Sequence, residues 1–357
     1  MRGEKRRWAG SFVLMAMLLA LIPSLGGCRS EQVSEKNEAV VNVYNWGEYI
    51  DPELVDRFEE ETGIDVIYSN YATNEDMYVK LKKGGASYDV VVPSEYMLQR
   101  MVEEEMLLPI DAARIPNLKN IDARFMHMDY DPEQKYSVPY FWGTVGILYN
   151  KKLVSDPVTS WDILWNPKYA RQIIMLDSSR DSLMIGLVRA GASPNSKNMD
   201  ELNQAKEDLI RQYPLVYAYL VDQTKDIMIN GENAMAVMYS GDALAAMQEN
   251  PDLDYAIPHE GGNLWFDVFA IPKGAKHKEN AEKFINFMLQ PDVMAQNAEW
   301  VGYSLPSEAG RALLPPELRD SPVAYPDPEA YRNAEVFTYL SDYVEIYDQL
   351  WQDVKNQ

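Results

Sequence analysis

The hydrophobic pattern after residue 39 alternates between short apolar runs and longer amphipathic stretches. The β-branched runs predict strands and the amphipathic stretches predict helices, which gives a β-α-β-α-β order over about the first hundred residues of this part. The predicted strands are Val40–Tyr44, Ile64–Tyr68 and Tyr88–Ser94. The predicted helices are Asp51–Gly63, Glu75–Lys83 and Glu95–Glu105. Because the run "DVVV" is apolar on both faces, the pattern indicates a parallel sheet covered by helices.

The second half of the chain continues with the same alternation. Its predicted strands are Gln172–Leu176, Asn233–Ser240, Asp254–Pro258 and a longer one at Trp265–Pro272. Its predicted helices include Ser182–Gly191, Asp200–Arg211, one that opens at Gly241-Asp242 and a final one at Ala330–Val354. The fold class is therefore α/β, and a length of 357 residues suggests two domains.

The N-terminus has the layout of a bacterial export signal. A basic stretch, "MRGEKRRWAG", precedes the apolar run Phe12–Ile22, which is too short to span a bilayer as a mature helix. "LGGC" then ends at Cys28, the position at which a lipoprotein signal places the residue that is lipidated. We therefore expect residues 1–27 to be a lipoprotein signal peptide and residues 28–39, which are polar and without periodicity, to be a flexible tether.

Composition narrows the choice of partners. The net charge is −22, which argues against nucleic acid or anionic lipid as a partner. The acidity is compatible with a cationic ligand, and equally with a role in solubility alone. The single Cys excludes an intrachain disulfide.

Catalytic and cofactor-binding motifs are missing from the sequence. It contains no G-x-G-x-x-G, phosphate loop, G-x-S-x-G or H-E-x-x-H, and its three His have no metal-ligand spacing. An enzyme, a metal site and a bound cofactor are therefore not expected.

Aromatic and acidic residues recur just after the predicted strands. "NWGEY", "SEY" (94–96), "DSSRD" (177–181) and "YSGD" (239–242) each follow an apolar run. Singly, such residues are often core aromatics or helix N-caps. In open α/β sheets, however, ligands bind outside the carboxyl ends of the strands, so four such turns predict one cleft. Aromatic faces and carboxylates together suit a flexible aliphatic amine.

Long segments of the sequence resemble the bacterial spermidine/putrescine-binding proteins of ABC importers. They include "YNWGEYIDPELVDRFEEETGIDVIYSNYATNEDMYVKLKKGGASYDVVVPSEYML", "YSVPYFWGTVGILYN", "EGGNLWFDVFAIPKGAKHKENAEKFINFMLQPDV" and "VGYSLP". The resemblance implies the type II periplasmic-binding-protein fold, in which ligand is held between two lobes. It places residues 40–140 and 268–308 in the N-terminal α/β lobe, and 141–267 and 309–357 in the C-terminal lobe. It also makes "WFDVFAIP" a hinge strand shared between the lobes.

The same resemblance assigns a set of ligand-binding residues. In it, Trp265 lies along the methylenes of the amine, Asp267 binds one amine and Asp181 grips a terminal ammonium. The positions that match are Trp46, Glu48, Tyr49, Ser94, Tyr96, Ser178, Asp181, Tyr239, Trp265, Asp267 and Tyr303.

Two of these positions depart from the family pattern. Ser178 stands where well-studied relatives carry a second Asp, and Tyr239 stands where some carry Trp. The loss of one negative charge leaves open whether spermidine or putrescine is preferred. Near Phe337, where a Gln contact could be expected, no role is transferred.

The resemblance therefore implies an extracytoplasmic, lipid-anchored, monomeric substrate-binding component that delivers polyamines to a membrane permease driven by a cytoplasmic ATPase. One alternative is a protein of the same fold for another cation, such as agmatine or an amino-sugar amine. Others are a cell-surface polyamine sensor or adhesin, and an enzyme on this fold.

Overall fold

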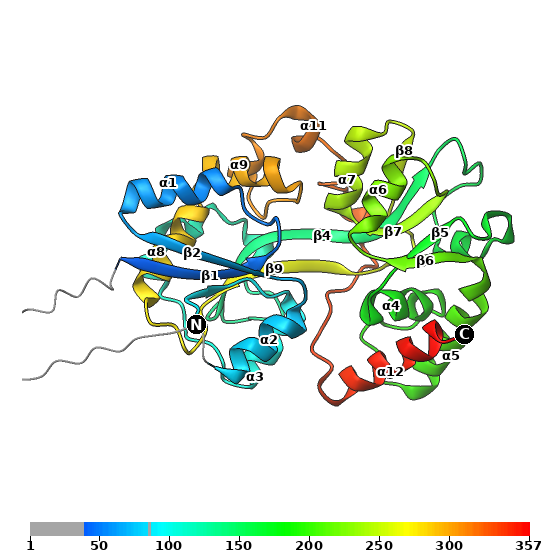
Figure 1. The fold of residues 1–357 in the computed structure, drawn as a ribbon, viewed down its shortest axis with the longest axis horizontal. Coiled ribbons are helices and arrows are strands. Elements are labelled where there is room, and N and C mark those ends of the chain that lie inside the picture. The colour runs from blue at the N-terminus through cyan, green and yellow to red at the C-terminus, as the bar shows by residue number, and fades with distance from the viewer. Residues whose placement is uncertain (1–38, 85–86) are drawn as a thin grey trace, which may run out of the picture. The chain divides into compact units, whose positions relative to one another are not determined.

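The strands of the protein form one mixed sheet in a computed structural model that describes residues 39–84 and 87–357. The strand order is β2-β1-β3-β9-β4-β7-β5-β6, and β8 pairs with β4 (Figure 1). The strands are β1 (Val40–Trp46), β2 (Asp65–Tyr71), β3 (Val90–Val91), β4 (Ser137–Asn150), β5 (Ile173–Leu176), β6 (Val216–Leu220), β7 (Met235–Tyr239), β8 (Leu253–Ala256) and β9 (Leu264–Ala270).

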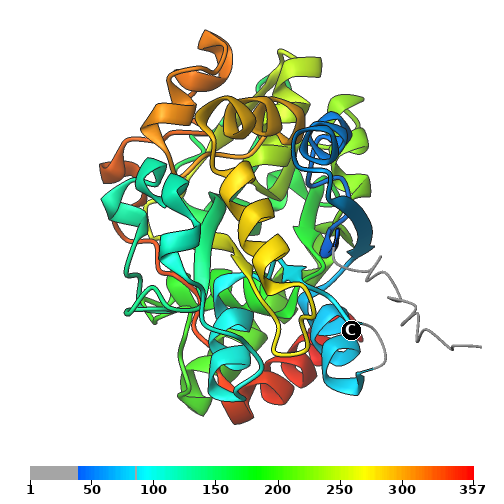
Figure 2. The ribbon, with the colours of Figure 1, turned by 90° about the vertical axis from the view of Figure 1, so that its left-hand side faces the viewer.

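Helices cover this sheet. They are α1 (Pro52–Thr62), α2 (Asn74–Lys83), α3 (Glu95–Glu103), α4 (Ser179–Arg189), α5 (Met199–Gln212), α6 (Gln223–Ile229), α7 (Ser240–Glu249), α8 (Lys278–Met288), α9 (Pro291–Val301), α10 (Glu308–Arg311), α11 (Pro316–Arg319) and α12 (Val344–Lys355). Figures 1 and 2 agree that α1 lies on one side of β1 and β2, with α2 and α3 on the opposite side. This two-sided cover explains why β1 and β3 have buried residues on both faces.

Parallel and antiparallel pairs divide the sheet. β1 runs parallel to β2 and β3, and β5 runs parallel to β6 and β7. The first part of β4, Ser137–Thr144, pairs with β9, whereas Val145–Asn150 pairs with β7 and β8. β9 pairs with β3 and β4. Among the described strands, β4 therefore pairs with strands in both halves of the sheet. The hinge role expected for "WFDVFAIP" stays a prediction.

The predicted helices and strands of the first hundred described residues are present, with shifts of a few residues at their ends. Asp51 caps α1 by accepting a hydrogen bond from the Glu53 amide, and Gly63 ends the helix in the left-handed conformation with φ 67°. The strand expected at Tyr88–Ser94 is reduced to Val90–Val91.

The final helix was predicted to be longer than it is. Two short 3-10 helices, Pro328–Tyr331 and Ser341–Tyr343, precede α12, which begins at Val344. Side chains hold the segment between them in a non-helical conformation, because Asn195 accepts a hydrogen bond from the Thr338 amide and Gln99 accepts one from the Tyr339 amide. The prediction of one helix over Ala330–Val354 is therefore wrong.

The described residues belong to one compact unit, Asn37–Gln357. The expected signal peptide, Cys28 and residues 29–38 of the tether lie outside the described residues, and the lobe boundaries stay a prediction. Across 39–84 and 87–357, no helix combines the length and the apolar character that a membrane span needs.

Candidate functional site

Asp267 is a buried carboxylate with two hydroxyl donors. Its side chain on β9 is 6% exposed. Tyr49 donates to its Oδ2 at 2.6 Å and Ser94 donates to its Oδ1 at 2.7 Å. Burial raises the pKa of Asp267 from 3.8 to about 6, against the two hydrogen bonds, which lower it. The three residues come from positions that lie far apart in the sequence, as the resemblance implies.

The turn after β3 places the Ser94 hydroxyl against the Asp267 carboxylate. It occupies the N-cap position of α3, yet its hydroxyl makes no cap hydrogen bond. That hydroxyl donates to Asp267, and the Ser94 amide donates to Asn74 Oδ1 at 3.1 Å. Since Ser at an N-cap usually accepts from the helix, this departure supports a functional role over a capping role.

The turn after β1 contributes one buried phenol and one half-buried indole. The Trp46 Nε1 donates to the Val92 carbonyl at 2.9 Å, and its ring lies 4.8 Å from the Tyr71 ring. Tyr49 is buried and reaches Asp267. Glu48, at φ 50°, is exposed and forms no hydrogen bond or ion pair among the described residues. The structure therefore brings Tyr49 into the site and leaves Glu48 outside it.

A second buried carboxylate, Asp181, lies at the start of α4 and is 4% exposed. Ser178 and Tyr239 donate to its Oδ2 at 2.7 and 3.0 Å. Asn263 donates to its Oδ1 at 3.3 Å. Burial raises the pKa of Asp181, and these three hydrogen bonds lower it. Ser178 is the N-cap of α4, and it accepts from the Asp181 amide at 3.2 Å.

Aromatic rings connect the two carboxylates. The Tyr239 and Tyr303 rings lie edge-on to the Trp265 indole at 6.2 and 5.0 Å between centroids. Tyr303 in turn lies 5.6 Å from the Tyr49 ring. A continuous set of contacts thus runs from Asp181 through these four rings to Asp267.

A third carboxylate, Asp242, was not among the predicted site residues. Tyr303 donates to its Oδ2 at 3.0 Å, and burial raises its pKa. Beside it, a Cβ on Gly241 would come within 2.0 Å of the Tyr303 ring, so glycine is needed for this close approach. The sequence did contain a signal for Asp242, because this residue ends the "YSGD" turn after a predicted strand.

Tyr96 lies next to the site through Asn74. Asn74 is buried and donates to both the Tyr96 hydroxyl at 3.0 Å and the Ser94 hydroxyl at 3.1 Å. Tyr96 donates to Glu75 Oε1 at 3.3 Å. Asn74 and Asn263 are further residues that sequence reasoning missed, because neither belongs to the aromatic and acidic pattern of the turns.

The chemistry of this arrangement favours an organic cation. Buried carboxylates accept charge-assisted hydrogen bonds from ammonium groups, and ring faces attract cations and cover methylenes. In the described part of the chain, no group of three His, Cys, Asp or Glu side chains is placed to hold a metal ion. The site therefore offers separate anionic positions along an aromatic wall.

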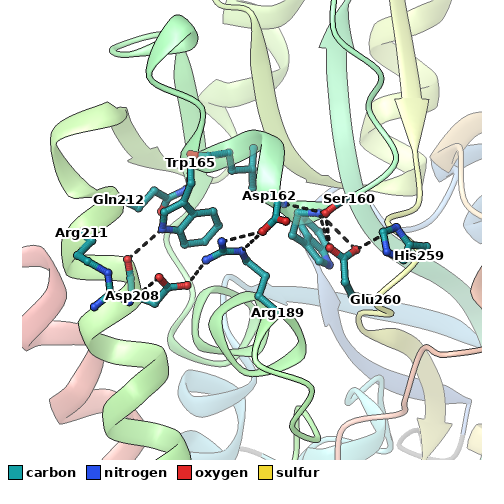
Figure 3. Close-up of polar contacts among 11 residues, drawn as sticks. Ser160, Asp162, Trp165, Arg189, Asp208, Arg211, Gln212, His259 and Glu260 are labelled. Carbon is teal, nitrogen blue, oxygen red and sulfur yellow. Dashed lines mark hydrogen bonds and ion pairs between the residues drawn. The ribbon is translucent and has the colours of Figure 1, made fainter.

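A different polar cluster has a structural role (Figure 3). The Arg189 guanidinium lies 3.6 Å from the Trp165 ring centroid and pairs with Asp162 and Asp208. Glu260 accepts hydrogen bonds from Ser160 and the Trp161 amide. These contacts join the 3-10 helix Trp161–Trp165 to α4, α5 and the loop before β9.

Comparison with known proteins gives a matching family model and a similar sequence. The family model described as "Bacterial extracellular solute-binding protein" matches residues 53–325. The spermidine/putrescine-binding periplasmic protein of Escherichia coli is 40% identical over 316 residues, which are 87% of this chain and 90% of that protein.

Two solved structures share the fold over nearly all of their length. The spermidine/putrescine ABC transporter substrate-binding protein of Streptococcus pneumoniae has a TM-score of 0.81 and 41% identity, over 89% of this chain and 98% of that one. The TpPotD lipoprotein of Treponema pallidum has a TM-score of 0.82 and 29% identity, over 89% and 100%. The predicted two-lobed α/β fold is thereby confirmed.

Proposed function

The chain belongs to the bacterial extracellular solute-binding proteins, and from this premise we propose that it captures polyamines outside the cytoplasm for an ABC importer. The resemblance seen in the sequence is confirmed, and so is the expectation that the protein is not an enzyme. In this proposal, the loaded protein delivers spermidine or putrescine to membrane permease subunits that a cytoplasmic ATPase drives.

The observation that carries the proposal is the environment of Asp267. Its carboxylate is buried, and its hydrogen-bonding partners are neutral hydroxyls rather than basic side chains. A buried carboxylate of this kind gains most from a cation that enters the site, because its own charge is costly to bury. The neighbouring Trp265 and Tyr303 rings supply the apolar cover that an aliphatic chain requires.

Asp181 is proposed to bind the other end of the ligand. Three neutral donors, Ser178, Tyr239 and Asn263, occupy part of the acceptor capacity of this carboxylate. Ser178 carries no charge, so this end offers one carboxylate where well-studied relatives offer two acidic residues. This difference favours a ligand with one ammonium group at the Asp181 end.

The proposed binding set comprises the residues predicted from the sequence, with two changes. Asp242, which accepts from Tyr303, is added to the set. Glu48 is removed from direct contact, because its side chain is exposed and unpaired in the described part of the chain. We further propose that the two lobes follow the predicted boundaries and close over the amine.

Attachment to the membrane is proposed to occur through a lipid on Cys28. The basic, apolar and "LGGC" segments in order support this anchor, as does the designation of the Treponema relative as a lipoprotein. Residues 28–39 would then be the tether of a monomer held at the outer face of the membrane. Cys28→Ser should move the protein from the membrane fraction to the soluble fraction, and an unchanged distribution would contradict the anchor.

Mass spectrometry of the ligand released by denaturing the purified protein tests the proposed function. We expect spermidine or putrescine, chemically unchanged, at up to one molecule per protein. Isothermal titration with both amines and with agmatine should then rank them. Absence of any heat with spermidine and putrescine, on protein first stripped of ligand, would overturn the proposal.

A further inference from the structure

Glu95 is a buried carboxylate directly behind the site. It is the acidic residue of the "SEY" turn, but it is not among the positions matched to the ligand-binding set. It is 1% exposed and is the first residue of α3. Its Oε2 accepts a hydrogen bond from the Phe266 amide at 2.8 Å. Phe266 is the residue between Trp265 and Asp267, so Glu95 holds the peptide that carries both.

Pro93, Ser94 and Glu95, at and just before the start of α3, each form a hydrogen bond with one of three successive residues of β9. The Pro93 carbonyl accepts from the Val268 amide at 3.0 Å, Ser94 donates to Asp267, and Glu95 accepts from the Phe266 amide. A hydroxyl or a carbonyl would suffice to bind a backbone amide. Burying a carboxylate at this place costs free energy when its charge has no ion-pair partner. The presence of Glu95 therefore indicates that its carboxyl group does more than bind an amide.

No basic side chain forms an ion pair with Glu95 among the residues that the structure describes. The titratable and charged groups around it are Asp267 on β9, Arg180 on α4, Tyr130 in the loop before β4 and Tyr96 on its own helix. Arg180 directs its guanidinium to the Thr338 carbonyl and to Asn195 at 3.1 and 3.0 Å. Arg180 is thus near enough to offset part of the negative charge of an ionised Glu95, but it forms no ion pair with it.

We propose that Glu95 is a positioning residue of the amine site whose carboxyl group also loses its proton when a cation binds at Asp267. The proposal rests on the proposed function, since it requires that the ligand is cationic. The hydrogen bond to Phe266 sets the positions of Trp265 and Asp267. The ionisation of Glu95 adds a second negative charge near the ammonium group without contact with the ligand.

The direction of the pH dependence follows from the environment of Glu95. Burial, together with the smaller effect of the negative charge of Asp267, raises the pKa of Glu95 to about 8, although the backbone hydrogen bonds and Arg180 lower it. A bound cation stabilises the ionised form and lowers this pKa, so binding releases a proton. The two primary amines of putrescine stay largely charged in this range, as the lysine side chain does with a pKa of about 10.4. Affinity should therefore rise with pH while Glu95 is still protonated in the free protein.

Titration calorimetry with putrescine between about pH 7 and about pH 8.5, and with spermidine at the lower pH only, in buffers of different ionisation enthalpy, tests the proposal. The wild-type protein should release part of one proton per amine and bind several-fold more tightly at the upper pH. Glu95→Gln keeps an acceptor for the Phe266 amide, so it should bind at the lower pH within about threefold of wild type, without proton release. Glu95→Ala removes the acceptor and should weaken binding about tenfold or more at every pH.

Glu103→Gln is the matched control, because Glu103 is an exposed residue of the same helix. It should leave the affinity and the proton release unchanged. Equal proton release by the wild type and Glu95→Gln would overturn the role of ionisation, and unchanged binding by Glu95→Ala, with folding checked by circular dichroism, would overturn the positioning role. If the wild-type protein binds neither amine, the proposed function fails instead, so the two failures are distinguishable.

Discussion

At the scale of single residues, Asp267 is expected to contribute most to ligand affinity. Asp267→Asn removes the negative charge that a buried ammonium group would meet, while it keeps the size of the side chain. Removing one partner of a buried charge pair typically costs about 3–5 kcal/mol, so affinity should fall at least about a hundredfold. Titration calorimetry measures this loss. Asp292→Asn, on the exposed surface of α9, is the control and should bind like wild type; equal affinities for all three proteins would remove Asp267 from the site.

The same substitution should have the opposite effect on the stability of the ligand-free protein. Folding raises the pKa of Asp267 from 3.8 to about 6, so between these values the folded state binds more protons than the unfolded state. Stability therefore falls as the pH rises through this window, and the cost is fully present at neutral pH. Asp267→Asn should raise the free energy of unfolding at pH 7 by up to about 3 kcal/mol, since each pKa unit is worth about 1.4 kcal/mol.

Urea unfolding of both proteins at pH 7 and near pH 4 checks this expectation. The gain should largely disappear at the lower pH, where the wild-type carboxyl group is already neutral in the folded state. A variant that is less stable than wild type at pH 7 would show that the hydrogen bonds from Tyr49 and Ser94 outweigh the cost of burying the charge.

Some residues of the site could be identified from the sequence and others could not. Tyr49, Ser94 and Asp267 belong to motifs of the resembled family, and the structure joins them by hydrogen bonds. Asn263 and Glu95 lie in the same quoted segments, but nothing in the sequence marks them as buried, because an amide or a carboxylate in an α/β chain is usually a surface residue. Their roles depend on burial, which arises only when segments distant in the sequence pack together.

At the scale of elements, the close approach of β4 to the Trp265 indole requires Gly143. A Cβ at this position would lie 2.5 Å from Trp265 Cζ2 and 2.7 Å from Ser240 Oγ. Gly143→Ala should therefore displace the indole and weaken amine binding about tenfold, in line with the 1–3 kcal/mol that overpacking usually costs. Calorimetry measures the loss. Gly274→Ala, where a Cβ meets nothing within 4 Å, should bind normally, and wild-type affinity for Gly143→Ala would show that the indole position is not critical.

The N-cap of α1 should affect stability without affecting binding. Asp51 accepts hydrogen bonds from the Glu53 amide at 3.0 Å and from Gln296 at 2.9 Å. Asp51→Ala leaves these donors unpaired and should lower the free energy of unfolding by about 1–2 kcal/mol. Urea unfolding measures the change, and Asp56→Ala, on the exposed side of the same helix, serves as control. A large loss of amine affinity instead would mean that α1 positions Tyr49.

The ends of a helix could be predicted where residues at those ends determine them. They could not be predicted where contacts with distant residues determine them. Asp51-Pro52 and Gly63 mark both ends of α1 by local chemistry. The segment before α12 has a helical pattern but is held open by Asn195 and Gln99, which lie far away in the sequence. The pairing of β4 with strands on both sides likewise depends on topology, because its residues alone do not state which neighbours it joins.

At the scale of the whole molecule, the site depends on segments spread over most of the chain. Tyr49 and Asp267 are 218 residues apart. Rings from β9, from β7 and from the turn after α9 complete the path to Asp181. Spacing in the sequence could not have shown this assembly. The family resemblance supplied it, and the physical pattern of four turns indicated only that a cleft for a cation was plausible.

The charge of the whole chain should also control how fast the amine is captured. A net charge of −22 produces a negative potential around the protein, which concentrates cations and accelerates their encounter with it. Salt screens this potential over about 10 Å at 0.1 M ionic strength, whereas contacts inside a buried site are screened much less. The association rate constant should therefore fall several-fold between about 0.01 M and about 0.5 M salt, with a smaller change in the dissociation rate constant.

Stopped-flow tryptophan fluorescence can follow this reaction, because Trp265 lies in the site and Trp46 borders it. Spermidine carries one more positive charge than putrescine, so its association rate should depend more steeply on salt, and the pair forms an internal control. Equal slopes for the two amines would mean that local steps at the site, and not the field of the whole protein, limit capture. A salt effect confined to the dissociation rate would locate the electrostatic contribution in the bound complex, at carboxylates such as Asp267.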